Sequence, residues 1–130
     1  MISSLDNHTV TTAEAPEAVV SAVRSYASEK GFQVLDVHDL SDAFDENGKN
    51  GEPAYVIELC NVEPTPGILH WDALASIMMP CKIAVYRKDG ETRICALSPN
   101  PIAKLFPQVA PHMEEAYRIM VSIVEELKPG

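Results

Sequence analysis

An Asp-Gly pair between two runs of β-prone residues is the feature of this sequence that most constrains its fold. Asp89 and Gly90 separate residues 81–86 from residues 92–97, and both runs are rich in apolar and β-branched side chains. A two-residue turn of this kind is typical of a β-hairpin, because glycine adopts a positive φ at little cost. The sequence therefore predicts two antiparallel strands around this turn.

Three further strands and one amphipathic helix are predicted before the hairpin, and a second helical piece is predicted within residues 68–77. Residues 7–12, 32–37 and 54–59 are β-prone. The amphipathic helix follows Thr12, a residue type favoured as an N-cap, and Gly31 marks its C-terminal end. Its apolar stripe recurs at helical spacing and consists of Val19, Val20, Val23 and Tyr26.

A second long helix is predicted to begin between Pro107 and Pro111 and to run to about Lys128. Its apolar positions alternate in steps of four and three residues, at Val109, Met113, Ala116, Met120, Ile123 and Leu127. This period of 3.5 residues is typical of a helix that packs along another helix. The favoured interpretation is a helix that covers the domain's own sheet, and the alternative is a contact between two copies of the chain.

The composition predicts one soluble domain, residues 1–130, and excludes several classes of protein. The formal charge of -9 repels phosphate groups, so nucleic acids and anionic membranes are not expected partners. No run approaches the roughly 18 apolar residues of a membrane helix. The first ten residues lack the pattern of a secretory signal, and three cysteines are too few for a disulfide-rich secreted scaffold. We therefore expect a reduced, cytoplasmic protein.

Cysteines at the ends of strands are the most distinctive chemical groups. Cys60 and Asn61 end one predicted strand, and Pro80 and Cys81 open the next. If the two strands are neighbours, the thiols approach one another and form a candidate ligand or thiol site. The alternation of side chains, however, places Cys81 on the core side and Cys60 on the opposite side. Cys95 lies inside a strand and is expected to be structural.

Signatures of catalysis and of metal binding are weak. The sequence contains no phosphate loop, nucleophile elbow or dinucleotide fingerprint, so we expect no enzyme and no cofactor. Cys60, His70 and Cys81 are metal-ligand types, but no closely spaced ligand pair predicts a metal site. His8 and His38 have no evident partners. The acidic residues of the segment 40–52 do not have the spacing of a calcium-binding loop.

Several motifs resemble one family. The run 55–61 ends in Cys-Asn, Met79-Pro80-Cys81 follows, and residues 83–86 then lead to a glycine turn. Together with residues 31–35, which read Gly-Phe-Gln-Val-Leu, and Ser98-Pro99, they resemble the family known as domain of unknown function 302. The resemblance covers residues 10–106 and leaves a C-terminal helix, 107–128, as an addition.

This resemblance implies a fold but no activity. It implies an α+β domain in two layers, with helices packed on one face of a mostly antiparallel or mixed sheet, often seen as a dimer. Two positions depart from the family pattern. Val62 stands where the family has proline after Cys-Asn, and Lys82 stands where it has asparagine after Pro-Cys.

The sequence favours a ligand-binding or homodimeric accessory module. The candidate site comprises Cys60, Asn61, Pro80 and Cys81, and the partners expected are a second copy of the chain and a small-molecule ligand. The alternative is a protein that uses Cys60 and Cys81 for redox chemistry, sulfur transfer or the handling of soft metals. A third interpretation is a purely structural domain whose last helix builds an interface.

Overall fold

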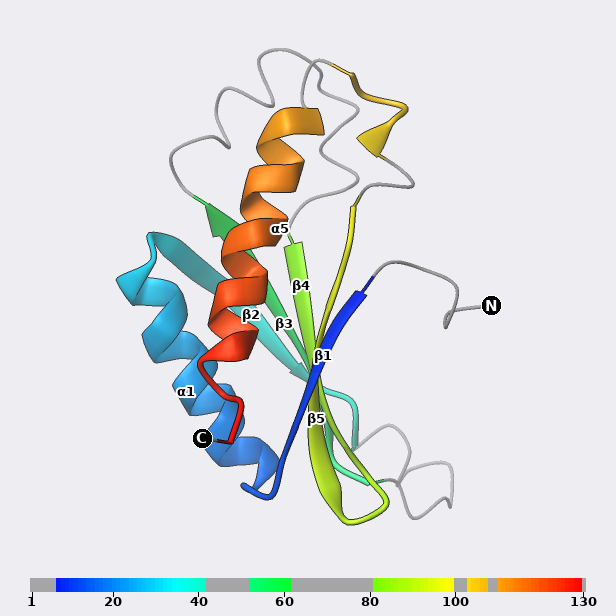
Figure 1. Ribbon diagram of the computed structural model, residues 1–130. Coiled ribbons are helices and arrows are strands. Elements are labelled where there is room, and N and C mark those ends of the chain that lie inside the picture. Colours follow the sequence, from blue (N-terminus) through cyan, green and yellow to red (C-terminus); the bar gives the residue numbers. More distant parts are fainter. Residues whose placement is uncertain (1–6, 42–51, 62–80, 100–102, 108–109, 130) are drawn as a thin grey trace.

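A computed structural model describes residues 7–41, 52–61, 81–99, 103–107 and 110–129. Most of the acidic segment 40–52, the helical piece predicted within residues 68–77, and Pro80 of the candidate site therefore lie outside the described residues. Figure 1 shows the arrangement of the seven helices and strands of the described ranges. In chain order they are β1 (Asn7–Thr12), α1 (Pro16–Glu29), β2 (Phe32–Asp39), β3 (Ala54–Asn61), β4 (Cys81–Lys88), β5 (Glu91–Leu97) and α5 (Ala110–Glu125).

The five strands form one antiparallel sheet. Their order is β1-β5-β4-β3-β2, so β4 is central and β1 and β2 are the edges. Each neighbouring pair is antiparallel, as predicted for the hairpin. Ala84 lies near the middle of the central strand, with Val56 of β3 on one side of it and Cys95 of β5 on the other.

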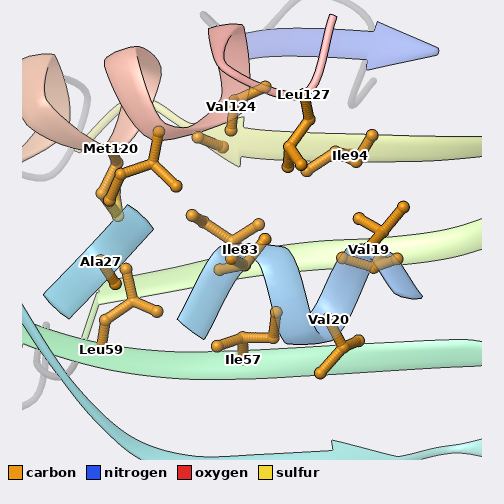
Figure 2. Close-up of a cluster of buried hydrophobic side chains, with 14 of the residues drawn as sticks. Val19, Val20, Ala27, Ile57, Leu59, Ile83, Ile94, Met120, Val124 and Leu127 are labelled. Carbon is orange, nitrogen blue, oxygen red and sulfur yellow. The ribbon is translucent and has the colours of Figure 1, made fainter. Parts of the chain in front are cut away.

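Both helices lie on the same face of the sheet (Figure 1), and we call this side the core face. Side chains from the helices and strands meet there, as Figure 2 shows. The strands alternate between fully buried and more exposed positions, as expected when only one face is covered by helices. The fully buried apolar strand residues are Ile57, Leu59, Ile83, Val85, Ile94 and Ala96. The predicted α+β architecture of helices on a sheet is thus confirmed.

The opposite side, which we call the open face, carries Val56, Ala84 and Cys95 in a row across three strands. Each of these side chains is half-buried. Neither α1 nor α5 covers them, because both helices pack on the core face.

The turn between β4 and β5 has the geometry that its sequence predicts. Asp89 has a φ of 54° and Gly90 a φ of 78°. Two consecutive residues with positive φ are typical of a type I′ turn, whose twist matches that of the flanking strands. Arg87 strengthens the turn, because its Nη2 donates a hydrogen bond to the carbonyl oxygen of Gly90 at 3.2 Å.

The start of α1 differs from the prediction. The N-cap is Ala15, without a side-chain cap, and Pro16 occupies the first turn, where its missing N–H group costs little. Thr12 instead remains in β1, and its hydroxyl accepts a hydrogen bond from the backbone N–H of Glu14 at 3.3 Å. At the other end, Gly31 has a φ of 82°, which confirms the predicted stop.

The apolar stripe of α5 packs in the protein's own core. The predicted stripe positions Met113, Ala116, Met120, Ile123 and Leu127 are all buried, and so is Val124, whereas Val109 lies outside the described residues. The favoured interpretation of a covering helix is therefore correct. Because these side chains are buried within one chain, the same stripe is not exposed to a second copy.

Polar contacts between described residues connect the sheet to α5, to α1 and to the segment before α1. Nε2 of His8 in β1 lies 2.5 Å from Oε1 of Glu125 at the end of α5. The hydroxyl of Tyr55 in β3 donates a hydrogen bond to Glu17 of α1 at 3.2 Å. The buried Thr92 of β5 donates to the carbonyl oxygen of Glu14 at 2.6 Å, which fixes the connection that precedes α1. His8 thus has a partner that the sequence does not reveal.

We expect Ile123→Ala to lower the free energy of unfolding by about 2–4 kcal/mol, because it leaves a cavity beneath α5. Ile123 is fully buried. Glu114→Ala, on the exposed side of the same helix, is the matched control and should change stability by less than about 0.5 kcal/mol. Urea unfolding followed by circular dichroism measures both. Equal stability of the two variants would show that α5 does not contribute to the core.

Candidate functional site

Cys60 and Cys81 lie at the same end of the sheet but on opposite faces. Leu59 and Cys81 are cross-strand partners, so Cys60 is one residue beyond that pair. Cys81 packs against the core cluster, on the side of Leu59 and Ile83. Cys60 has the opposite orientation and is half-buried on the open face. The alternation of side chains predicted from the sequence agrees with this arrangement.

Burial raises the pKa of the Cys81 thiol to about 11, and the neighbouring Cys60 adds to this increase. The ammonium group of Lys82 acts in the opposite direction, but its effect is smaller. A thiol with such a pKa is almost entirely protonated near neutral pH, and the thiolate is the nucleophile and the metal ligand. Cys81 is therefore poorly suited to redox catalysis or sulfur transfer.

All three cysteines lie in described strands, and each is a thiol rather than half of a disulfide.

Of the remaining candidate residues, Asn61 ends β3, where its backbone is paired with Phe32 of β2. The open face contains Cys95 in mid-strand, opposite Ala84 of β4 and Thr9 of β1. The structure thus brings Cys60 and Cys81 to one end of β3 and β4, and it separates their side chains.

A cluster that the sequence does not predict lies on the open face at the edge of the sheet. Asp36 and His38 come from edge strand β2, and Glu58 comes from its neighbour β3. Asp36 and Glu58 are cross-strand partners, and His38 follows Asp36 by two residues. We call these three residues the Asp-His-Glu cluster.

A β-bulge at Leu35 turns the cluster outward. The pairing of β2 with β3 shifts between Val34 and Asp36, so one residue of β2 is unpaired. Val34 and Val37 consequently both contact the core cluster, although they are three residues apart. Asp36 lies between these two valines in the sequence, and His38 follows Val37. Both side chains are exposed. A bulge commonly redirects side chains in this way.

The geometry of the cluster is compact. Nε2 of His38 lies 2.5 Å from Oε1 of Glu58 and 3.8 Å from Oδ2 of Asp36. One ligand atom from each residue lies within 4.8 Å of the other two. The hydrogen bond to Glu58 raises the pKa of His38, and the negative charge of Asp36 adds to the increase. Partial desolvation and the charge of Lys82 oppose it.

The cluster was missed because a strict alternation of side chains places Asp36 on the same side as Val34. The sequence feature that could have revealed the bulge is the spacing of apolar residues, since Val34 and Leu35 are adjacent and Val37 follows. Such a break in the period of two indicates a bulge. The expectation that His38 has no partner is therefore wrong.

A protein-family model described as "Domain of unknown function DUF302" matches residues 8–127. The chain belongs to the DUF302 family. This confirms the resemblance inferred from the motifs, and the matched range also includes α5.

A solved structure supports the same fold. The crystal structure of an uncharacterized conserved DUF302 protein from Bacillus stearothermophilus superposes with a TM-score of 0.86 at 19% sequence identity. The similarity covers 94% of this chain and 98% of the other. No curated protein matches the chain.

Among the described residues, neither helix has the length and apolar character needed to cross a membrane. DUF302 membership thus gives the architecture and leaves the activity to be argued from the site.

We expect Cys81 to react slowly in the folded protein. In the variant Cys60→Ser/Cys95→Ser, where Cys81 is the only cysteine, alkylation at neutral pH should be slower than in urea by up to about 100-fold, since burial, the larger cause of the raised pKa, remains. A pKa near 11 rather than the ordinary 9.0 reduces the thiolate fraction by that factor. The variant Cys81→Ser/Cys95→Ser, which retains Cys60, is the control. Equal rates for Cys81 with and without urea would contradict this account.

We expect the pKa of His38 to lie above its ordinary value of 6.5 and to fall towards that value in Glu58→Gln. Asp36→Asn should produce a smaller decrease, because the charge of Asp36 is the weaker cause. Because the pKa is raised, the His38–Glu58 contact stabilises the folded state at pH below 6.5 and is lost as the pH rises through the raised value. NMR titration of the imidazole measures all three proteins. An unchanged pKa in Glu58→Gln would contradict the assignment.

Proposed function

We propose that this DUF302 protein is a non-catalytic accessory module that works as a homodimer, in which two copies pair through the open faces of their sheets. One observation carries the proposal. Both long helices cover the core face, and within the described residues no helix covers the apolar row in the middle of the other face.

The composition of the open face resembles that of a protein interface. Val56, Ala84 and Cys95 form its centre, and Leu97 on β5 is an exposed large apolar side chain, with 45% of its surface accessible. Charged residues surround this centre, including Lys82 at one end of β4. An apolar centre inside a polar rim is characteristic of interfaces between proteins.

The shape of the face suits a second sheet. Two sheets pack face to face in many β-sandwiches, and small side chains such as Ala84 allow them to approach closely.

For a small-molecule ligand, we propose contact with Cys60 rather than with Cys81. Cys60 and Lys82 share the open face at the end of β3 and β4, whereas Cys81 is turned towards the core. Thiol chemistry that needs both cysteines is the less favoured function, because the two side chains lie on opposite faces and the pKa of Cys81 is raised to about 11.

The oligomeric state tests the pairing. We expect Ala84→Glu to weaken the dimer at least 100-fold, because it buries an unpaired charge at the centre of the interface. Ala84 points away from the core, so the variant should fold. Ser25→Glu introduces the same charge on the exposed surface of α1 and is the matched control. Sedimentation velocity over a range of concentrations, with circular dichroism as a check of folding, measures both variants.

The supporting result is a dimer for the wild type and for Ser25→Glu, and a folded monomer for Ala84→Glu. A wild-type protein that stays monomeric at high micromolar concentration would refute the proposal. A dimer that survives Ala84→Glu unchanged would also refute it, because the interface would then lie elsewhere.

A further inference from the structure

We propose that Asp36, His38 and Glu58 bind one divalent transition-metal ion at the edge of the open face. This inference goes beyond the homodimeric function and does not depend on it. The cluster spans edge strand β2 and its neighbour β3, whereas the apolar centre of the open face lies on β3, β4 and β5.

The donor atoms converge on one point from two strands. Nε2 of His38 lies between two carboxylates, 2.5 Å from Oε1 of Glu58 and 3.8 Å from Oδ2 of Asp36. All three donor atoms lie within 4.8 Å of one another. Metal bonds of about 2.1 Å in tetrahedral or octahedral geometry require donors roughly 3.0–3.4 Å apart. The two distances to His38 therefore need changes of less than about 1 Å, and the two carboxylates, whose ligand atoms lie within 4.8 Å, need to approach by at most roughly 1.8 Å to accept an ion.

These changes are available to side chains that solvent surrounds. The side chains of Asp36 and His38 are 62% and 47% accessible, and that of Glu58 is 21% accessible. Rotation of the two exposed side chains opens the contact without disturbing the core. The exposed side of the cluster also leaves room for water molecules to complete the coordination sphere.

One carboxylate already has the orientation that a ligand needs. The backbone N–H of Val37 donates a hydrogen bond of 2.8 Å to Oδ1 of Asp36, and the other oxygen, Oδ2, is the one nearer to His38. Hydrogen bonds to the non-coordinating atoms of ligands fix their orientation in many metal sites. The bulge at Leu35 contributes further, because it turns Asp36 and His38 to the same side as Glu58.

The donor set selects the class of ion. One imidazole nitrogen and two carboxylate oxygens suit Zn²⁺, Co²⁺, Ni²⁺ or Mn²⁺. Ca²⁺ prefers six to eight oxygen ligands, and Cu⁺ prefers sulfur. The net charge of -9 favours cations in general, whereas the ammonium group of Lys82, the cross-strand partner of Glu58, opposes a dication. Removal of this charge should therefore strengthen binding.

Isothermal titration of the untagged full-length protein with ZnCl₂ at neutral pH tests the proposal. We expect one Zn²⁺ per chain, at least tenfold weaker binding in His38→Gln and Glu58→Gln, and tighter binding in Lys82→Gln. His8→Gln is the matched control, because His8 forms a similar pair with Glu125 at 2.5 Å but is not part of a three-ligand cluster among the described residues. Binding to His8→Gln should equal that of the wild type.

The absorption spectrum of the Co²⁺-loaded protein identifies the ligands independently. We expect d–d bands that disappear in His38→Gln, and no thiolate charge-transfer band. Circular dichroism of His38→Gln should match that of the wild type, since His38 is exposed. The proposal is overturned if Zn²⁺ does not bind, if binding survives in His38→Gln, or if Cys60→Ser abolishes it. None of these results bears on the pairing of two chains through Ala84.

Discussion

The packing of α1 and α5 against a single face of the sheet determines where the other groups lie. The buried residues of β3, β4 and β5 alternate with more exposed ones, so each strand has a core side and an open side. Apolar burial contributes roughly 25 cal/mol for each Å² removed from water, and it therefore fixes the register of every strand against the helices. The position of a residue in its strand therefore decides whether its side chain faces the core or the open side. Odd and even residues of one strand face different environments, and within the described residues only the core side is covered by helices.

This sorting separates the two cysteines that the sequence suggests as a pair. Cys60 and Cys81 reach the same end of β3 and β4, yet one faces the open side and the other the core. The same rule groups residues that are distant in the sequence. Glu58 joins Asp36 and His38 because all three are on the open side of neighbouring strands. A shared face brings side chains together more effectively than closeness in sequence.

The sequence predicted the features that depend on local chemistry. Asp89 and Gly90 predict the hairpin because few residues accept a positive φ. The helical spacing of the apolar residues in α5 predicts which side of that helix is buried. Thr12 was wrongly expected to cap α1, because a threonine near a helix start is also compatible with the end of a strand. The Asp-His-Glu cluster was missed for a different reason. It depends on the pairing of β2 with β3, including one unpaired residue, and a pairing register is a tertiary property.

The bulge at Leu35 lets β2 hold one extra residue without changing which side chains face outward. If Leu35 were paired with β3, regular alternation would direct Asp36 and His38 towards the hydrocarbon interior, where unpaired ionised groups are strongly destabilising. With Leu35 unpaired, both side chains face outward while Val34 and Val37 keep their apolar contacts. Relatives that lack this extra residue would carry the same side chains on each face, because Asp36 would then follow Val34 in regular alternation. Alignments of DUF302 proteins around this strand can therefore treat a single gap at Leu35 as a change of length that leaves the surface of this sheet edge the same.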